Sequence, residues 1–144
     1  MSESRIRHNY WAILVAAIAC FALEGGWYTI FQESWMNGTG RTREWLMSAA
    51  GSMPWIQYPT AFVMAALMAI GIDCVTQLTG PQTAPRGIKV GLLLWLGFIF
   101  TSWSTEYAFE VRPLSLLGIN AGFWILGVIV MGAIVGGWKK QAAA

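Results

Sequence analysis

The sequence predicts an all-α integral membrane protein, a bundle of four helices with both termini in the cytoplasm. Three observations lead to this prediction. The 144 residues are 56% hydrophobic and only 11% charged, whereas a soluble domain carries about 25% charged residues. The mean hydropathy is +0.53. The apolar residues are gathered into four long segments instead of being dispersed along the chain.

This composition argues against a soluble enzyme, a nucleic-acid-binding protein and a disordered chain, because too few charged side chains are present to cover a water-exposed surface. The net charge of +2 is too small to indicate a polyanionic partner. We therefore expect membrane lipids around the protein and no nucleic-acid partner.

Each apolar segment is long enough to cross the bilayer as a helix, which takes about 20 residues. The expected helices of a single domain, 1–144, cover about 10–31, 53–75, 88–109 and 114–138, with polar loops at 32–52 and 76–87 and a tight turn at 110–113. Pro54 suits the first turn of the second helix, and Pro113 introduces the fourth. Pro59 lies deeper in the second helix and is expected to bend it.

The placement of Lys and Arg predicts the orientation, since cytoplasmic loops carry an excess of both. Six of these residues lie on the side of the termini and three on the opposite side: Arg5, Arg7, Arg86, Lys89, Lys139 and Lys140 against Arg41, Arg43 and Arg112. Both termini are therefore expected in the cytoplasm, and the membrane is expected to be a bacterial inner membrane.

Aromatic residues fall near the expected ends of the helices: Tyr10, Trp11, Trp35, Trp45, Trp55, Trp103 and Trp138. The favoured interpretation is an aromatic belt, in which amphipathic rings lie at the level of the lipid headgroups. The alternative is a pocket lined by Trp that holds a cofactor or pigment.

Small residues recur at four-residue spacing, which places them in stripes along single helix faces. The stripes consist of Ala61, Ala65 and Ala69; Gly87 and Gly91; Gly118 and Gly122; and Gly132 and Gly136. Small residues allow close approach of helix backbones in a membrane. The stripes predict packing within a four-helix bundle, or alternatively association with a second copy or with another membrane protein.

Ionisable residues at membrane depth are costly and point to function. Glu24 lies about 14 residues into the first helix, or about 21 Å along its axis. We expect an outward-facing polar pocket lined by Glu24, Glu106, Tyr107, Glu110, Arg112 and Asn120. Its carboxylates could bind a cation or carry protons. The alternative is local satisfaction, with Glu110 paired to Arg112, Glu106 reaching the interface and Glu24 protonated against a neighbouring helix.

No motif indicates catalysis or metal binding. The single histidine, His8, lies in the N-terminal segment, so neither a His-rich metal site nor a Ser-His-Asp triad can form. The glycines lie inside apolar helices and form no phosphate-binding loop. Asp73, near the cytoplasmic boundary, is expected to be solvated. We therefore expect a protein that is not an enzyme, with no cofactor and no metal.

Several stretches of the sequence carry a family resemblance. The most specific are Phe109-Glu110-Val111-Arg112-Pro113 and Ile119-Asn120-Ala121-Gly122, supported by Asn9-Tyr10-Trp11, Gly26-Trp27-Tyr28, Leu94-Trp95-Leu96-Gly97-Phe98 and Met131-Gly132-Ala133-Ile134-Val135-Gly136. Through them the chain resembles the DUF1761 family, small four-helix membrane proteins of bacteria and fungi with no assigned function. The resemblance implies the four-helix topology and supplies no reaction.

The sequence departs from the family pattern at three places. Thr29-Ile30 stands where the pattern has Ser-Pro, Glu106 where Asn is common, and Glu24 where a small residue is expected. These departures imply that any role of Glu24 or Glu106 belongs to this protein and not to the whole family.

The leading functional hypothesis is a non-enzymatic subunit or accessory protein that packs against itself or a larger membrane complex. A homo-oligomer or such a complex is the expected partner. The second hypothesis is a carrier or channel for a small solute or cation that uses the acidic pocket around Glu24. A third, weaker hypothesis is binding of a lipid, quinone or pigment between the helices.

Overall fold

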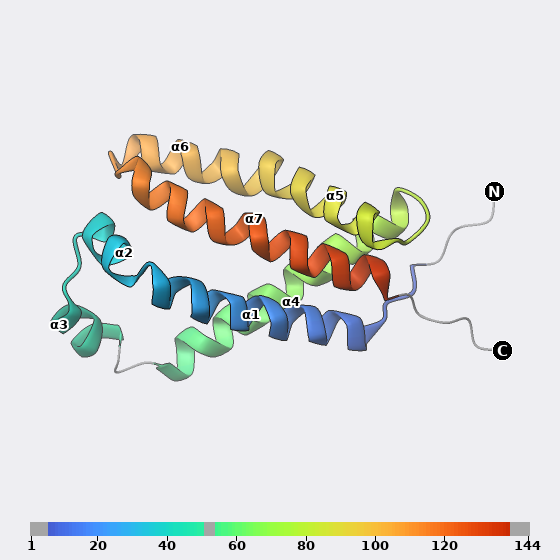
Figure 1. The fold of residues 1–144 in the computed structure, drawn as a ribbon, viewed down its shortest axis with the longest axis horizontal. Coiled ribbons are helices and arrows are strands. Elements are labelled where there is room, and N and C mark those ends of the chain that lie inside the picture. The colour runs from blue at the N-terminus through green and yellow to red at the C-terminus, as the bar shows by residue number, and fades with distance from the viewer. Residues whose placement is uncertain (1–5, 51–53, 139–144) are drawn as a thin grey trace.

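A computed structural model describes residues 6–50 and 54–138, and these ranges contain helices but no strand. The helices are α1 (Tyr10–Ile30), α2 (Gln32–Thr39), α3 (Arg43–Trp45), α4 (Pro54–Leu78), α5 (Ala84–Leu94), α6 (Thr101–Phe109) and α7 (Leu114–Gly137), with π-helical segments at Leu46–Ala50 and Trp95–Phe100. The second π-helical segment joins α5 and α6 into one uninterrupted stretch, as Figure 1 shows.

Four helical stretches are long and apolar enough to cross a membrane: Tyr10–Ile30, Trp55–Leu78, Ala84–Phe109 and Leu114–Gly137. They confirm the predicted all-α class and the number of spans. The third begins at Ala84 instead of Ile88, because Thr83 caps the helix by accepting a hydrogen bond from the Arg86 amide. The fourth follows its predicted limits within one residue.

The four spans run side by side, and each reverses the direction of the one before it (Figure 1). The start of α1, the α4–α5 connection and the end of α7 therefore lie together, and we call this the terminal end. There the Asn9 side-chain amide donates to the Trp138 carbonyl oxygen at 3.1 Å. The opposite, or α2–α3, end holds α2, α3 and the α6–α7 turn. Which end faces the cytoplasm stays a prediction.

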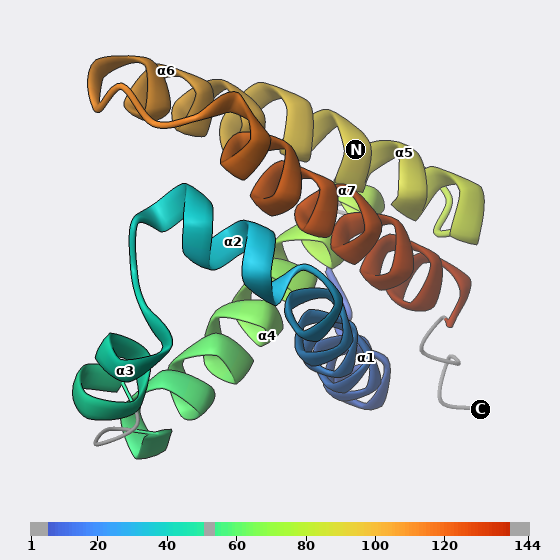
Figure 2. The same cartoon turned by 60° about the vertical axis from the view of Figure 1, so that its left-hand side comes forward.

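The expected loop at 32–52 is wrong for most of its length, since α2, α3 and a π-helical segment occupy it. The polar composition of this segment favoured a loop, although the segment contains the capping residues that define these short helices. Gly40 ends α2 with φ +67°, a left-handed conformation that favours glycine. The Thr42 side chain accepts a hydrogen bond from the Trp45 amide at 3.2 Å and so begins α3. Figure 2 shows α2 directed toward α7, on which it packs.

The last span, α7, lies at the centre of the bundle and packs against α1, α4 and α5. Half of its most apolar stretch is buried within the chain, against 17% for the corresponding stretch of Ala84–Phe109. Its buried side chains include Phe123, Val128, Met131 and Val135, which form the main core together with Ala65 of α4 and other residues of α1 and α4. The other spans expose most of their apolar surface, as helices in contact with lipid do.

Glycines bring the backbones of α5 and α7 into contact. Gly87 of α5 faces the backbone of Gly132, and Gly91 faces Val128. A Cβ atom at Gly91 would lie only 2.7 Å from the Val128 carbonyl oxygen, and one at Gly136 would also meet backbone atoms. Such close approach is a main source of helix attraction in a membrane, because lipid tails are as apolar as the side chains that they replace.

The other predicted small residues have varied surroundings. Ala65 and Ala69 are buried in the core, whereas Ala61 is only partly buried. Gly122 faces the indole ring of Trp27, with 3.2 Å between that ring and an added Cβ atom, and Gly118 has open space around it. Most of the stripes thus make contacts inside the chain.

Substitution of Gly132 by Ala tests the α5–α7 contact. The added methyl group would overlap the Gly87 backbone, which cannot move as a flexible side chain could, so we expect a loss of about 1–3 kcal/mol in the free energy of unfolding. Unfolding by heat or SDS in mild detergent measures it. The matched control is Gly97→Ala, where nothing lies within 4 Å of the added atom; equal stability of the two variants would contradict the role of the contact.

Candidate functional site

Glu24 lies on α1, in the half of the helix that leads to the α2–α3 end. Tyr28 follows one turn later on the same face of α1, and Gln32, the first residue of α2, lines the same cavities. The Glu24 side chain is partly buried. Within the described ranges, its carboxylate has no hydrogen bond and no ion pair. Glu24 is therefore a carboxylate at membrane depth without a partner among the residues that the structure describes.

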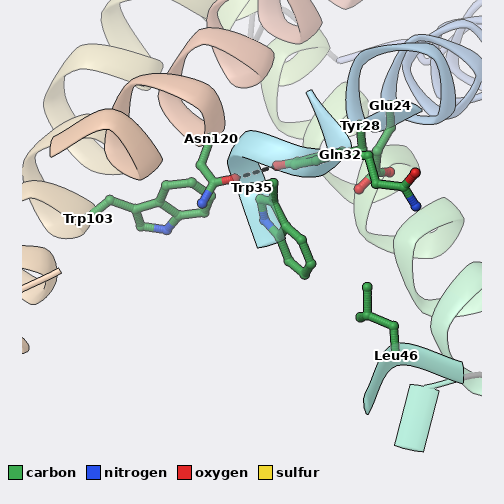
Figure 3. Close-up of a pocket in the computed structure, with 7 residues that line it drawn as sticks. All are labelled: Glu24, Tyr28, Gln32, Trp35, Leu46, Trp103 and Asn120. Atoms are coloured by element: carbon green, nitrogen blue, oxygen red, sulfur yellow. Dashed lines mark hydrogen bonds between the residues drawn. The ribbon is translucent and has the colours of Figure 1, made fainter. Parts of the chain in front are cut away.

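Two cavities lie beside Glu24. The first has a volume of about 450 Å³ and lies between α1, α2, α6 and α7 (Figure 3). Its lining residues are Glu24, Tyr28, Gln32, Trp35, Leu46, Trp103 and Asn120. The second has a volume of about 490 Å³, lies between α1 and α4, and adds Phe21, Gln57, Tyr58 and Ala61. Glu24, Tyr28 and Gln32 line both cavities.

A short hydrogen-bond network forms the inner wall of the first cavity. The Tyr28 hydroxyl donates to the Asn120 side-chain oxygen at 2.8 Å, and Figure 3 draws this bond. The Asn120 amide nitrogen in turn donates to the Tyr107 hydroxyl oxygen at 2.5 Å. Asn120 is 8% exposed and Tyr107 is 5% exposed. Since a buried amide without partners is strongly destabilising, the network fixes how α1, α6 and α7 meet.

Two indole groups position α7 on either side of Asn120. The Trp27 ring nitrogen donates to the Ile119 carbonyl oxygen at 3.0 Å, and the Trp95 ring nitrogen donates to the Ala121 carbonyl oxygen at 3.1 Å. Both rings thus make hydrogen bonds inside the bundle, and neither residue belongs to the predicted aromatic belt. Trp103 stacks on Tyr107 with an interplanar angle of 11°, and this brings its ring to the cavity wall.

The predicted polar pocket is only partly assembled. Glu24 and Asn120 line the first cavity, and Tyr107 stands behind Asn120. Glu106, Glu110 and Arg112 are exposed and line neither cavity. Glu110 forms an ion pair with Arg112, as the local-satisfaction alternative has it. The Arg112 guanidinium also lies 5.3 Å from the centre of the Tyr107 ring.

Other lining residues were not predicted from the sequence, although a signal for some of them exists. Tyr28 and Gln32 follow Glu24 at four-residue intervals in the sequence, a spacing typical of one helix face. Trp35, Trp103 and Tyr58 also line the cavities. For Trp35 and Trp103 the aromatic belt was the favoured interpretation and a pocket lined by Trp was the alternative, and their position at the first cavity fits the alternative. Leu46 comes from a segment that was expected to be a loop, so the sequence offered no signal for it.

Asp73, expected to be solvated, is 2% exposed, and this prediction is wrong. Its carboxylate lies 2.7 Å from the His8 ring nitrogen and accepts hydrogen bonds from Gln77 at 2.9 Å and Gln82 at 2.8 Å. Gln82 also donates to the Val135 carbonyl oxygen at 2.7 Å. Asp73 thereby links the N-terminal segment, the α4–α5 connection and α7 at the terminal end.

No group of three His, Cys, Asp or Glu residues in the described ranges has the geometry to hold a metal ion. The side chains that line the two cavities include one carboxylate, two amide groups besides that of Asn120, and several aromatic rings. Such a lining can bind a ligand by charge, hydrogen bonds and ring contacts.

A family model described as "Protein of unknown function (DUF1761)" matches residues 11–136. Neither the curated proteins nor the solved structures give a significant match to the chain. The matched range contains every residue that lines the two cavities, whereas His8 lies outside it.

Substitution of Asn120 by Ala tests the network. It leaves the Tyr28 and Tyr107 hydroxyls without their shared partner, so we expect a loss of about 1–3 kcal/mol in the free energy of unfolding. The measurement is unfolding in mild detergent. Asn37→Ala on exposed α2 is the matched control and is expected to change stability by less than about 0.5 kcal/mol. Equal free energies of unfolding for the two variants would contradict a stabilising role of the network.

Proposed function

The chain belongs to the DUF1761 family of proteins of unknown function, and we propose that it binds a small, positively charged organic solute at Glu24 within its helical bundle. Such a solute is a specific case of the small solute or cation that the carrier hypothesis predicts from the sequence. The family itself supplies no reaction, so the proposal is argued from the chemistry of the two cavities.

The observation that carries the proposal is the partnerless carboxylate of Glu24, which two cavities share. A charge held at membrane depth is destabilising unless another charge or several hydrogen bonds compensate it. The described residues provide neither for Glu24. A cationic ligand in either cavity would supply the missing charge.

The walls of the cavities support a cation that also carries apolar groups. Aromatic rings attract cations through their negative faces, and several rings around one site favour alkylated ammonium groups. Tyr28, Trp35 and Trp103 line the first cavity, and Phe21 and Tyr58 line the second. Tyr28 makes an edge-to-face contact with Trp35, as Phe21 does with Tyr58. Both volumes fall in the range of about 300–1,000 Å³ that is typical of small-molecule sites.

The shared lining also supports carriage of the solute. Glu24, Tyr28 and Gln32 border the cavity beside α6 and the cavity beside α4. A solute bound to the Glu24 carboxylate could therefore move from one cavity to the other without losing its counter-charge. We propose a carrier or channel that uses this carboxylate as its single ionic site.

The remaining hypotheses have less support. Most of the small-residue stripes make contacts inside the chain, so the leading expectation of a packing subunit loses one of its arguments. An oligomer or larger complex stays a prediction. A neutral quinone or pigment would leave Glu24 without a counter-charge. Nothing in the lining favours catalysis, and a bacterial inner membrane remains our expectation.

Binding is best tested with benzyltrimethylammonium as the probe, followed through the change in tryptophan fluorescence, to which Trp35 and Trp103 of the first cavity contribute. We expect the wild-type protein to bind this cation and to ignore its neutral carbon isostere. Glu24→Gln removes the charge and keeps the shape, so we expect a loss of about 10- to 100-fold in affinity, the value of a hydrogen bond or contact to a charged group.

The matched control is Glu33→Gln, since Glu33 is an exposed carboxylate of α2 that lines neither cavity. Its affinity should equal that of the wild type. Equal affinities of the Glu24→Gln and wild-type proteins would contradict the proposal. Liposome flux of the same probe, with the same two variants, separates carriage from binding alone.

A further inference from the structure

We infer that a cationic groove at the terminal end binds the phosphate group of an anionic phospholipid. The groove lies where the α4–α5 connection meets the first turns of α5, and its volume is about 440 Å³. Thr79, Thr83, Arg86, Lys89, Val90 and Leu93 line it. It shares no lining residue with the cavities at Glu24.

The groove carries two positive charges and no negative one. Arg86 and Lys89 are three residues apart on α5, so they lie on one face. No carboxylate lines the groove. In the described ranges the ion pairs are His8 with Asp73 and Arg112 with Glu110, so neither Arg86 nor Lys89 has an acidic partner from the chain. The phosphodiester of a phospholipid carries one negative charge and would compensate part of this positive charge.

The Arg86 guanidinium is held in place before any ligand binds. It donates a hydrogen bond to the Thr79 carbonyl oxygen. Gly80 leaves the room that it occupies, because a Cβ atom at Gly80 would lie 2.5 Å from a guanidinium nitrogen. Gly80 has φ +141°, a conformation that other residues rarely adopt. The bond to Thr79 uses one of the five N–H donors of the Arg86 guanidinium, so the remaining donors can bind phosphate oxygens.

The shape of the groove favours a lipid over a free anion. Its wall continues from Arg86 and Lys89 to Val90 and Leu93, which lie further along the span. Leu93 is 60% exposed, and its apolar surface can accept an acyl chain. Basic pockets at the ends of membrane helices, with apolar walls beyond them, suit anionic headgroups. The start of α5 adds the positive end of a helix dipole.

The test compares lipids added to the purified protein in neutral detergent, with the thermal midpoint as the readout. We expect dioleoylphosphatidylglycerol to raise the midpoint and dioleoylphosphatidylcholine not to do so. A gain of about fivefold in affinity is expected for each cation near a lipid charge. Lys89→Gln should therefore weaken the apparent affinity about fivefold, and the double variant R86Q/K89Q about 25-fold.

The matched controls are Arg43→Gln and the double variant R41Q/R43Q, which remove exposed cations at the α2–α3 end and should leave the affinity unchanged. If substitution of Arg86 prevents folding, the Lys89→Gln variant alone still tests the inference, because the Lys89 side chain is exposed and its loss should not affect folding. Equal effects of the two lipids, or equal losses in the control and groove variants, would overturn the inference. Sodium phosphate forms a separate arm: stabilisation as strong as that by the lipid would show a site for free phosphate and overturn the lipid assignment.

Discussion

The contact between the backbones of α5 and α7 is the constraint on which the rest of the bundle depends. Gly87 and Gly132 place the two helices so close that no side chain fits between them. Beyond α5, side chains of the same span contact α7 instead: Trp95 of the π-helical segment bonds to Ala121, and Tyr107 of α6 bonds to Asn120. The glycine contact therefore sets the register in which Asn120 meets its partners. Tyr28 of α1 bonds to the same amide. The geometry of the cavity wall therefore depends on the glycine contact, which lies several turns away.

Polar groups inside a membrane must find partners in the protein, because the hydrocarbon offers none. The bundle follows this rule at Asn120 and at Asp73, where three side chains surround one carboxylate. Groups that depart from this rule in the described ranges include the buried Ser104 hydroxyl, which has no hydrogen-bond partner, and the Glu24 carboxylate, which alone of the two carries a charge when ionised. The contrast between two carboxylates of one small protein carries the proposed function: one holds segments together, and the other borders two cavities that are lined by aromatic rings. A structural role explains Asp73 fully and leaves Glu24 unexplained.

Hydropathy alone was enough to predict the four spans, because each must match the thickness of the bilayer. The depth of Glu24 and the polarity of Asn120 also marked them as candidates. Glu106 does not line either cavity, because it is adjacent to Tyr107. Adjacent residues of a helix point about 100° apart, so both side chains could not face α7. The burial of Asp73 could not be predicted, since His8 is 65 residues away in the sequence and only the folded bundle brings them together. Pairing of distant segments leaves no periodic trace in the sequence.

The two proposed sites have opposite charge and lie at opposite ends of α4, which contributes Tyr58 to one and reaches the other through Thr79. Tyr58 and Thr79 are 21 residues apart, which is a rise of about 32 Å along the helix axis. At that separation two unit charges interact by only about 0.5 kcal/mol at an effective dielectric constant of about 20, so direct electrostatic influence between the sites is small. Any effect of a bound phospholipid on the affinity at Glu24 would have to pass through a movement of α4 as a rigid element. The core contacts of Ala65 and Ala69 oppose that movement, so the two sites should act independently unless the packing of α4 itself changes.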